Sequence, residues 1–276
     1  MSQKSPSVEA SEPVVAPDHF CIVVDDLQKA IQDYEALGFT VLPGVQKKNS
    51  GNALIGLADG VYIELAQVPR TIMRLLRMSR HIGLLSLLLS GKRAMMKRIV
   101  LHWGNAEAGQ WIDWCLSTRA LEDSIATAQA QAVPIAPLPF TFQRPTADGG
   151  MAKWRMTGTI DTGLPFLIED VPGYAPRVPL TLEHPHKNGA SQLLRVVVGS
   201  SDPKETLAGL SVICGIAADN DRITIRGVDF IVEHAPDKAM AGPLELVLST
   251  TDESHAGQLL DTRLTGGAKI RLESQI

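Results

Sequence analysis

The sequence contains two copies of one pattern of strands and a helix, and this repeat limits the folds that the chain can adopt. The first copy begins with the strand "HFCIVV" and the helix "DLQKAIQDYEALG", followed by the strands "FTVLP", "NALIGLA" and "GVYIELA". The second begins with the strand "IDWCLST" and the helix "RALEDSIATAQAQA", followed by the strands "VPIAPLPF", "MAKWRMTGTI" and "LPFLIED". Each copy is therefore predicted to form one βαβββ module.

A constant offset of 94 residues relates the start of the two copies. The apolar face of the first helix, formed by Leu27, Ile31 and Tyr34, is repeated by Leu121, Ile125 and Ala128. The same offset carries Cys21 onto Cys115 and His19 onto Asp113. At the far end, "VYIEL" and "FLIED" are predicted to place Glu64 and Glu169 in the same position of the closing strand.

The remaining segments are predicted to be weaker copies and insertions. "LLRVVV", "DPKETLAGLSVICG" and "RITIRGVDFIVE" resemble a third copy with Leu193 in the place of His19, and "GPLELVLSTTD" resembles the start of a fourth. We therefore expect an α+β fold in which paired βαβββ modules form a curled mixed sheet. The predicted parts are a flexible leader (1–16), a domain (17–172) with modules 17–66 and 111–172 around a basic helical insert (67–110), and a degenerate C-terminal region (173–276).

The ends of the predicted strands carry groups that can bind a divalent cation. If the two curled modules face each other across a cleft, one imidazole and three carboxylates can converge there, from His19, Glu64, Asp113 and Glu169. This donor set suits Zn, Mn, Fe, Ni or Mg and leaves positions open for water or substrate. The ion can polarise a substrate oxygen while Glu64 or Glu169 moves a proton. The alternative interpretation is that both glutamates are ordinary solvated residues.

Five further residues are candidates for the same cleft. Arg144 and Arg155 can hold a substrate carboxylate or phosphate, and the amide of Asn52 can hold a substrate oxygen. His184 and His186 are second-rank metal ligands. For Asn52 and the two histidines, a role in a turn is the competing explanation, and for the two arginines it is simple solvation.

The insert has its own pattern of charge. Arg70, Arg74 and Arg77 fall on one helical face among apolar residues, and no acidic residue occurs from Val68 to Gly104. Three interpretations fit this pattern: a helix on a membrane surface, a helix that covers the cleft, and a helix buried in the core or in a homodimer interface.

The charge, the apolar runs, the cysteines and the missing motifs argue against several classes of protein. A net charge of −4 and a pI of about 6.0 disfavour nucleic-acid binding. The longest apolar run, "IGLLSLLL", is too short for a transmembrane helix, which needs roughly 20 residues. Three scattered cysteines indicate a reducing, cytoplasmic location. The chain has no GxGxxG, P-loop, GxSxG or HExxH motif.

Several stretches together resemble a glyoxalase-like domain of the vicinal oxygen chelate superfamily, over about residues 17–190. They are "DHFCIVVDDLQKAIQDYEALGFTVLPG", "SGNALIGLADGVYIEL", "FQRPTADGG", "LPFLIED" and "HPHKNGA". The resemblance implies paired modules around a metal, with ligands on the first and last strands of each module. His19, Glu64 and Glu169 match these positions, whereas Asp113 stands where the superfamily often has histidine or glutamine. "HPHKNGA" is longer than the related pattern HPNGA.

The resemblance implies a divalent-metal-dependent lyase or isomerase that acts on a small oxygenated substrate. True glyoxalase I is disfavoured, because no stretch resembles its glutathione contacts. The competing enzyme is an iron-dependent extradiol-type dioxygenase, which would need His184 or His186 to join His19 on the metal. The non-enzymatic alternative is a protein that binds or sequesters a small molecule in the same cleft, and it is favoured if Glu64 and Glu169 face away from each other.

Overall fold

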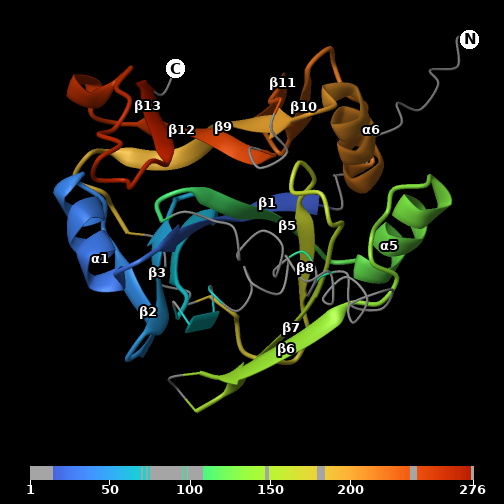
Figure 1. Ribbon diagram of the computed structural model, residues 1–276, viewed down its shortest axis with the longest axis horizontal. Helices are drawn as coiled ribbons and strands as arrows, with labels where there is room; N and C mark the ends of the chain where they lie inside the picture. The colour runs from blue at the N-terminus through green and yellow to red at the C-terminus, as the bar shows by residue number, and fades with distance from the viewer. Residues whose placement is uncertain are drawn as a thin grey trace, which may run out of the picture.

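The computed structural model describes residues 15–69, 108–146, 149–178, 184–236 and 241–274, together with residues 71, 72, 74, 95 and 98 of the insert. Within this part of the chain the strands form two sheets, one above the other in Figure 1. The predicted α+β fold with a curled mixed sheet is confirmed. Among the described residues, no helix has the length and apolar character needed to cross a membrane.

The larger sheet holds the two predicted modules side by side. Its eight strands lie in the order β2-β3-β4-β1-β5-β8-β7-β6, so the first strands of the modules, β1 and β5, are antiparallel neighbours at the centre. The first module consists of β1 (Val15–Val24), α1 (Leu27–Ala36), β2 (Leu42–Lys47), β3 (Ser50–Gly56) and β4 (Tyr62–Gln67). The second consists of β5 (Trp111–Thr118), α5 (Leu121–Ala130), β6 (Phe140–Pro145), β7 (Met151–Thr157) and β8 (Phe166–Asp170).

The strand register shows that the predicted offset is the symmetry of the sheet. His19 pairs with Cys115, and Cys21 pairs with Asp113. Because Asp113 and Cys115 lie 94 residues after His19 and Cys21, these two pairs are equivalent to each other. Phe20 and Trp114, which are also 94 residues apart, face each other between the two pairs. The modules are therefore related by an approximate twofold axis that passes between β1 and β5.

The smaller sheet repeats the same plan with fewer strands. Its order is β10-β11-β9-β12-β13, with an antiparallel centre formed by β9 and β12. The third copy consists of β9 (Ala190–Ser200), α6 (Pro203–Cys214), β10 (Arg222–Ile225) and β11 (Val228–His234). The fourth consists of β12 (Gly242–Thr250), the short 3-10 helix η2 (Glu253–His255) and β13 (Lys269–Ser274). Leu193, at the position predicted to correspond to His19, is buried in the core.

The two sheets pack together through apolar side chains that point to the same side of the larger sheet. Trp114 of β5 stacks on Phe230 of β11, with ring centroids 5.4 Å apart, and Phe20 stacks on Trp114 on the same side of the sheet. Successive residues of a strand face opposite sides, so His19, Cys21 and their neighbours face away from the second sheet. That side is the concave face of the curled sheet in Figure 1.

Three local expectations differ from the structure or lie outside it. The predicted strand at 133–140 is an irregular segment, because its three prolines cannot donate ladder hydrogen bonds, and the strand begins at Phe140 instead. β1 begins at Val15, which is buried, two residues inside the predicted leader. Residues 1–14 and most of the insert, including Arg70 and Arg77, lie outside the described residues.

Candidate functional site

The concave face brings His19 and Glu64 together at the centre of the first module. In the parallel pairing of β1 with β4, His19 lies beside Tyr62 and Cys21 lies beside Glu64. Paired residues share a face of the sheet, and so do alternate residues of one strand. Donor atoms of His19, Cys21 and Glu64 consequently lie within 4.8 Å of one another.

This group fits a single divalent cation by its donor chemistry. Two ligands on opposite sides of a zinc-sized ion lie up to roughly 4.6 Å apart, which is close to the observed spread of the nitrogen, sulfur and oxygen donors. Burial and the charge of Glu64 raise the pKa of the Cys21 thiol well above its ordinary value. Cys21 must therefore lose a proton before it can join His19 and Glu64 as a ligand.

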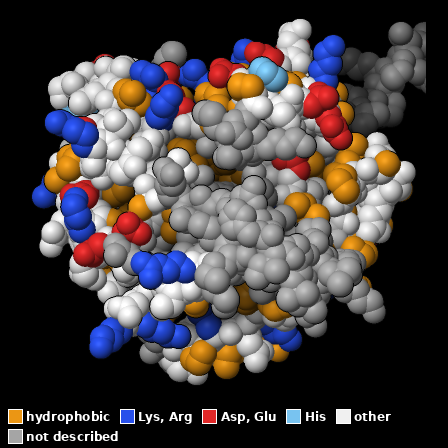
Figure 2. Space-filling model, in the orientation of Figure 1, with side chains coloured by type: hydrophobic (Ala, Val, Ile, Leu, Met, Phe, Trp, Pro, Cys, Tyr) orange, Lys and Arg blue, Asp and Glu red, His pale blue; other side chains and the backbone are white. Residues whose placement is uncertain are grey.

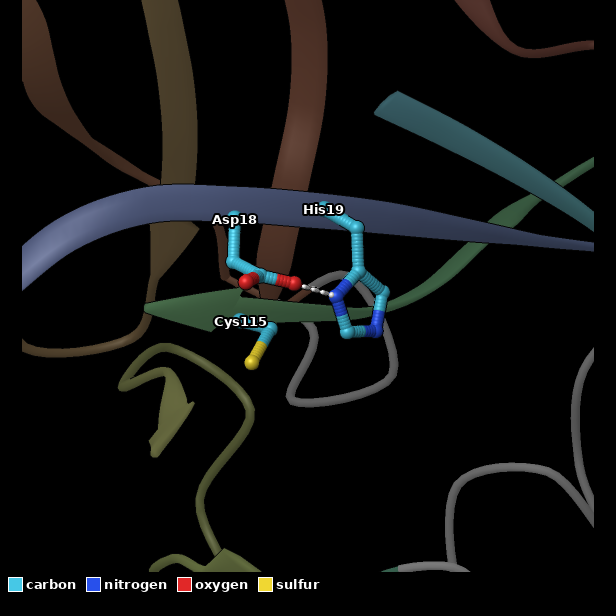
Figure 3. A group of neighbouring side chains, drawn as sticks. All are labelled: Asp18, His19 and Cys115. Atoms are coloured by element: carbon cyan, nitrogen blue, oxygen red, sulfur yellow. Dashed lines mark hydrogen bonds and ion pairs between the residues drawn. The ribbon is translucent and has the colours of Figure 1, made fainter. Parts of the chain in front are cut away.

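Asp18 holds the ring of His19 (Figure 3). The Asp18 carboxylate accepts a hydrogen bond from Nδ1 of His19 at 2.5 Å. Tyr62 stacks on the imidazole with a centroid separation of 4.8 Å, and Phe166 packs edge-on at 5.4 Å. Burial opposes the charge of Asp18, but the bond from His19 and the charge of Arg177 hold its pKa below the ordinary value. The ring is fixed at Nδ1, which leaves Nε2 as its other coordinating atom.

Asn52 holds the carboxylate of Glu64. Its Nδ2 donates to Glu64 Oε1 at 2.8 Å, while its Oδ1 accepts from the backbone N–H of Val45 at 2.7 Å. Asn52 therefore connects the β2–β3 hairpin to Glu64. The structure thus places Asn52 beside Glu64, and its amide contacts this candidate ligand directly.

In the second module, Asp113 occupies the position equivalent to His19, and an arginine neutralises its charge. Asp113 is buried and forms an ion pair with Arg98 of the insert at 2.6 Å, in which neither side chain reaches solvent. The other N–H groups of Arg98 donate to the carbonyls of Thr159, Asp161 and Leu164. Every donor of the guanidinium is thus engaged. Asp113 is on the predicted face, but its carboxylate is committed to Arg98 and does not join His19 and Glu64.

The strand register corrects the predicted equivalence of Glu64 and Glu169. Glu64 lies beside Cys21, whereas the residue beside Cys115 is Phe166. Glu169 is three residues further along β8, and an odd separation in a strand turns a side chain to the opposite face. Phe166 therefore occupies the equivalent position on the concave face, and the structure does not bring Glu169 together with His19 and Glu64.

Glu169 instead caps a helix on the outer side of the sheet. Its Oε1 accepts from the backbone N–H of Leu121 at 3.2 Å, at the start of α5, where Ala120 supplies no side-chain cap. Its Oε2 pairs with Arg155, which also pairs with Glu122. Arg155 is thereby placed on the outer side as well. Both residues line a groove of about 1020 Å³ at the ends of β5 and β8.

Two arginines lie at the edge of the concave face. Arg144 donates from Nη2 to the backbone oxygen of Arg177 at 2.6 Å, and its buried Nε has no hydrogen-bond partner in the described part of the chain. Arg177 pairs with Asp18 at 2.9 Å and donates to the hydroxyl of Tyr62. Sequence reasoning missed Arg177, which lies in the loop after β8.

The two second-rank histidines lie away from this group. Nδ1 of His186 accepts from the backbone N–H of Thr40 and its Nε2 donates to the carbonyl of Gly56, both at 2.9 Å. Both nitrogens of His186 are therefore used to attach the "HPHKNGA" segment to the first module. Among the described residues, the groups with metal-binding spacing include neither His184 nor His186.

On the face of the molecule shown in Figure 2, charged side chains of both signs are present among the described residues. This distribution agrees with the small net charge of the chain.

Comparison with known proteins supports the fold and identifies a family. The profile of a family described as the glyoxalase-like domain matches residues 18–214. A hypothetical protein from Staphylococcus aureus has 18% identity and a TM-score of 0.66 over 95% of this chain and 100% of its own. A mutant of 4-hydroxymandelate synthase from Streptomyces coelicolor has 12% identity and a TM-score of 0.50, and the match covers 87% of this chain and 72% of that protein. A Mn(II)-bound glyoxalase from Novosphingobium aromaticivorans has 11% identity and a TM-score of 0.48, and the match covers 92% of this chain and 69% of that protein. No curated protein matches the chain.

Proposed function

The chain belongs to the glyoxalase-like family, and on that premise we propose that it is a divalent-metal-dependent lyase or isomerase of a small oxygenated substrate. The observation that carries the proposal is the convergence of His19 and Glu64 on the concave face, each held by a neighbouring side chain. The metal is one of Zn, Mn, Fe or Ni, and when bound it polarises a substrate oxygen as a Lewis acid.

The surrounding residues have separate tasks in this proposal. Glu64 would hold the ion together with His19, and its carboxylate would also be available as a base for a substrate bound there. Arg144 orients an anionic group of the substrate, because its guanidinium has a buried Nε without a partner in the described residues. Phe166 gives the second half of the concave face an apolar surface beside His19. We also propose a cytoplasmic location, since all three cysteines are unpaired and buried.

A second candidate is a protein that binds a small molecule without metal chemistry. Two observations favour it: Glu64 and Glu169 face opposite sides of the sheet, and the Arg98–Asp113 pair commits the remaining carboxylate. The dioxygenase alternative lacks comparable support, because the described residues bring no second histidine to His19.

The deciding experiment is a measurement of metal binding. Protein purified without a histidine tag is analysed for metal, stripped, and titrated with Mn, Zn, Fe and Ni by calorimetry. We expect about one ion per chain, lost in Glu64→Ala and retained in Glu169→Gln, which changes a carboxylate on the opposite face. Absence of binding by any of the four ions contradicts the metalloenzyme and favours the binding protein.

A further inference from the structure

Arg177 makes contacts that link it to both residues that hold the ring of His19. From the loop after β8, its Nη2 lies 3.0 and 2.9 Å from the two carboxylate oxygens of Asp18. Its Nη1 donates to the hydroxyl of Tyr62. The Arg177 side chain is 10% exposed, so these bonds form in a largely desolvated place. There a charge-assisted hydrogen bond is stronger than in water.

The partners of Arg177 restrain His19 in two different ways. Asp18 accepts the hydrogen bond from Nδ1, which determines the ring nitrogen that carries the proton. Tyr62 lies against the flat side of the ring at an interplanar angle of 11°, which determines its tilt. Both restraints depend on the placement of Asp18 and Tyr62, and one guanidinium is bonded to both.

The backbone around Arg177 is itself held in place. Arg144 donates to the carbonyl of Arg177, and Nε of Arg177 lies 3.2 Å from an oxygen of Asp170 at the end of β8. In addition, Ala175 pairs with Ala152 of β7 in an isolated bridge. The loop therefore presents the guanidinium from a fixed position at the edge of the sheet.

We propose that Arg177 is a positioning residue that sets the tautomer and orientation of His19, so that Nδ1 carries the proton and Nε2 is the nitrogen that binds a cation. The assignment of Nε2 as ligand rests on the proposed function, whereas the tautomer does not. A carboxylate behind a ligating histidine orients the ring and raises its basicity, and loss of such support typically costs 10- to 100-fold in metal affinity. Arg177 acts one contact further out, by holding that carboxylate and the stacked tyrosine together.

The test is nitrogen NMR of the imidazole in the metal-free protein, combined with Mn and Zn titration. Long-range proton–nitrogen spectra are recorded at a pH where the ring is neutral, and the His19 signals are assigned with His19→Gln. We expect a single tautomer with the proton on Nδ1 in the unmodified protein. In Arg177→Gln we expect a mixture of tautomers and a Kd for Mn and Zn that is about 10- to 100-fold higher.

Three further variants test the specificity of the effect. Tyr62→Phe keeps the stacked ring and removes only the hydroxyl that Arg177 contacts, so we expect a smaller shift in the same direction. Arg263→Gln removes an arginine that is 88% exposed and paired with Asp261, and it should change nothing at His19. Arg177→Lys retains the charge without the fork that reaches both partners, so we expect only partial rescue.

The outcomes separate this inference from the proposed function. A proton on Nε2 in the unmodified protein, or an unchanged tautomer in both Arg177→Gln and Tyr62→Phe, overturns the inference. If the tautomer changes in Arg177→Gln but the unmodified protein binds no cation, the role of Arg177 stands and the proposed metal function fails.

Discussion

Arg98 and Asp113 form an ion pair at 2.6 Å with both side chains buried, and it connects the insert to the second module. Removal of one partner leaves an uncompensated buried charge, so Arg98→Met should lower the free energy of unfolding by about 3–5 kcal/mol. The double variant Arg98→Met with Asp113→Leu should recover part of this loss, because replacement of both charges removes the desolvation cost. Chemical denaturation measures both values. A single variant as stable as the double would show that Asp113 finds another partner.

Glu169 should matter for the stability of α5 and not for the concave face. Glu169→Ala removes the acceptor for the first backbone N–H of the helix, so we expect a loss of about 1 kcal/mol in the free energy of unfolding. Glu169→Gln retains an acceptor oxygen and should lose less. Thermal unfolding of the two variants side by side checks this order, and equal losses would assign the effect to the Arg155 pair instead.

Asn52 should influence cation binding through Glu64. Asn52→Ala removes the hydrogen bond that holds Oε1, so we expect the Kd for Mn and Zn to rise about 10- to 100-fold without loss of the site. Gln28→Ala is a matched control, because the amide of Gln28 is bonded to Gln46 on an exposed surface. Calorimetry of both variants is sufficient, and an equal effect in the two would argue against a role for Asn52.

His186 should make the stability of the protein depend on pH. Burial and the neighbouring charge of His184 lower the pKa of His186 from its ordinary value of 6.5. The unfolded chain therefore binds a proton more readily than the folded protein does. The contribution of His186 is present in full above pH 6.5 and is lost as the pH falls through the lowered pKa. His186→Gln should flatten the fall in unfolding free energy below pH 6.5, which chemical denaturation at a series of pH values measures.

The sequence was sufficient to predict the modular fold, because each module repeats an apolar helix face after a largely apolar strand. The constant offset of 94 residues across the first strand and helix is also the twofold symmetry of the central strand pair. His19 and Glu64 could be predicted as neighbours for the same reason. They lie on the first and last strands of one module, which are adjacent and parallel.

The second half of the site could not be predicted, because the offset changes along the module. It is 94 residues between Cys21 and Cys115 but 102 between Glu64 and Phe166, since the hairpin strands of the second module lie further along the chain. The prediction matched Glu64 to Glu169, three residues beyond the equivalent Phe166. Because side chains alternate between the two faces of a strand, this error placed Glu169 on the wrong face. Arg98 and Arg177 lie outside the repeat, so no periodicity could link them to Asp113 and Asp18.

The approximate twofold between β1 and β5 leaves the two modules free to diverge in chemistry while they share one frame. Phe20 and Trp114, opposite each other at the axis, anchor both halves to the second sheet. On the concave side, one half carries the polar donors His19 and Glu64, and the other carries the aromatic ring of Phe166 and the buried Arg98–Asp113 ion pair. A duplicated scaffold of this kind can alter reactivity through one copy and specificity or stability through the other.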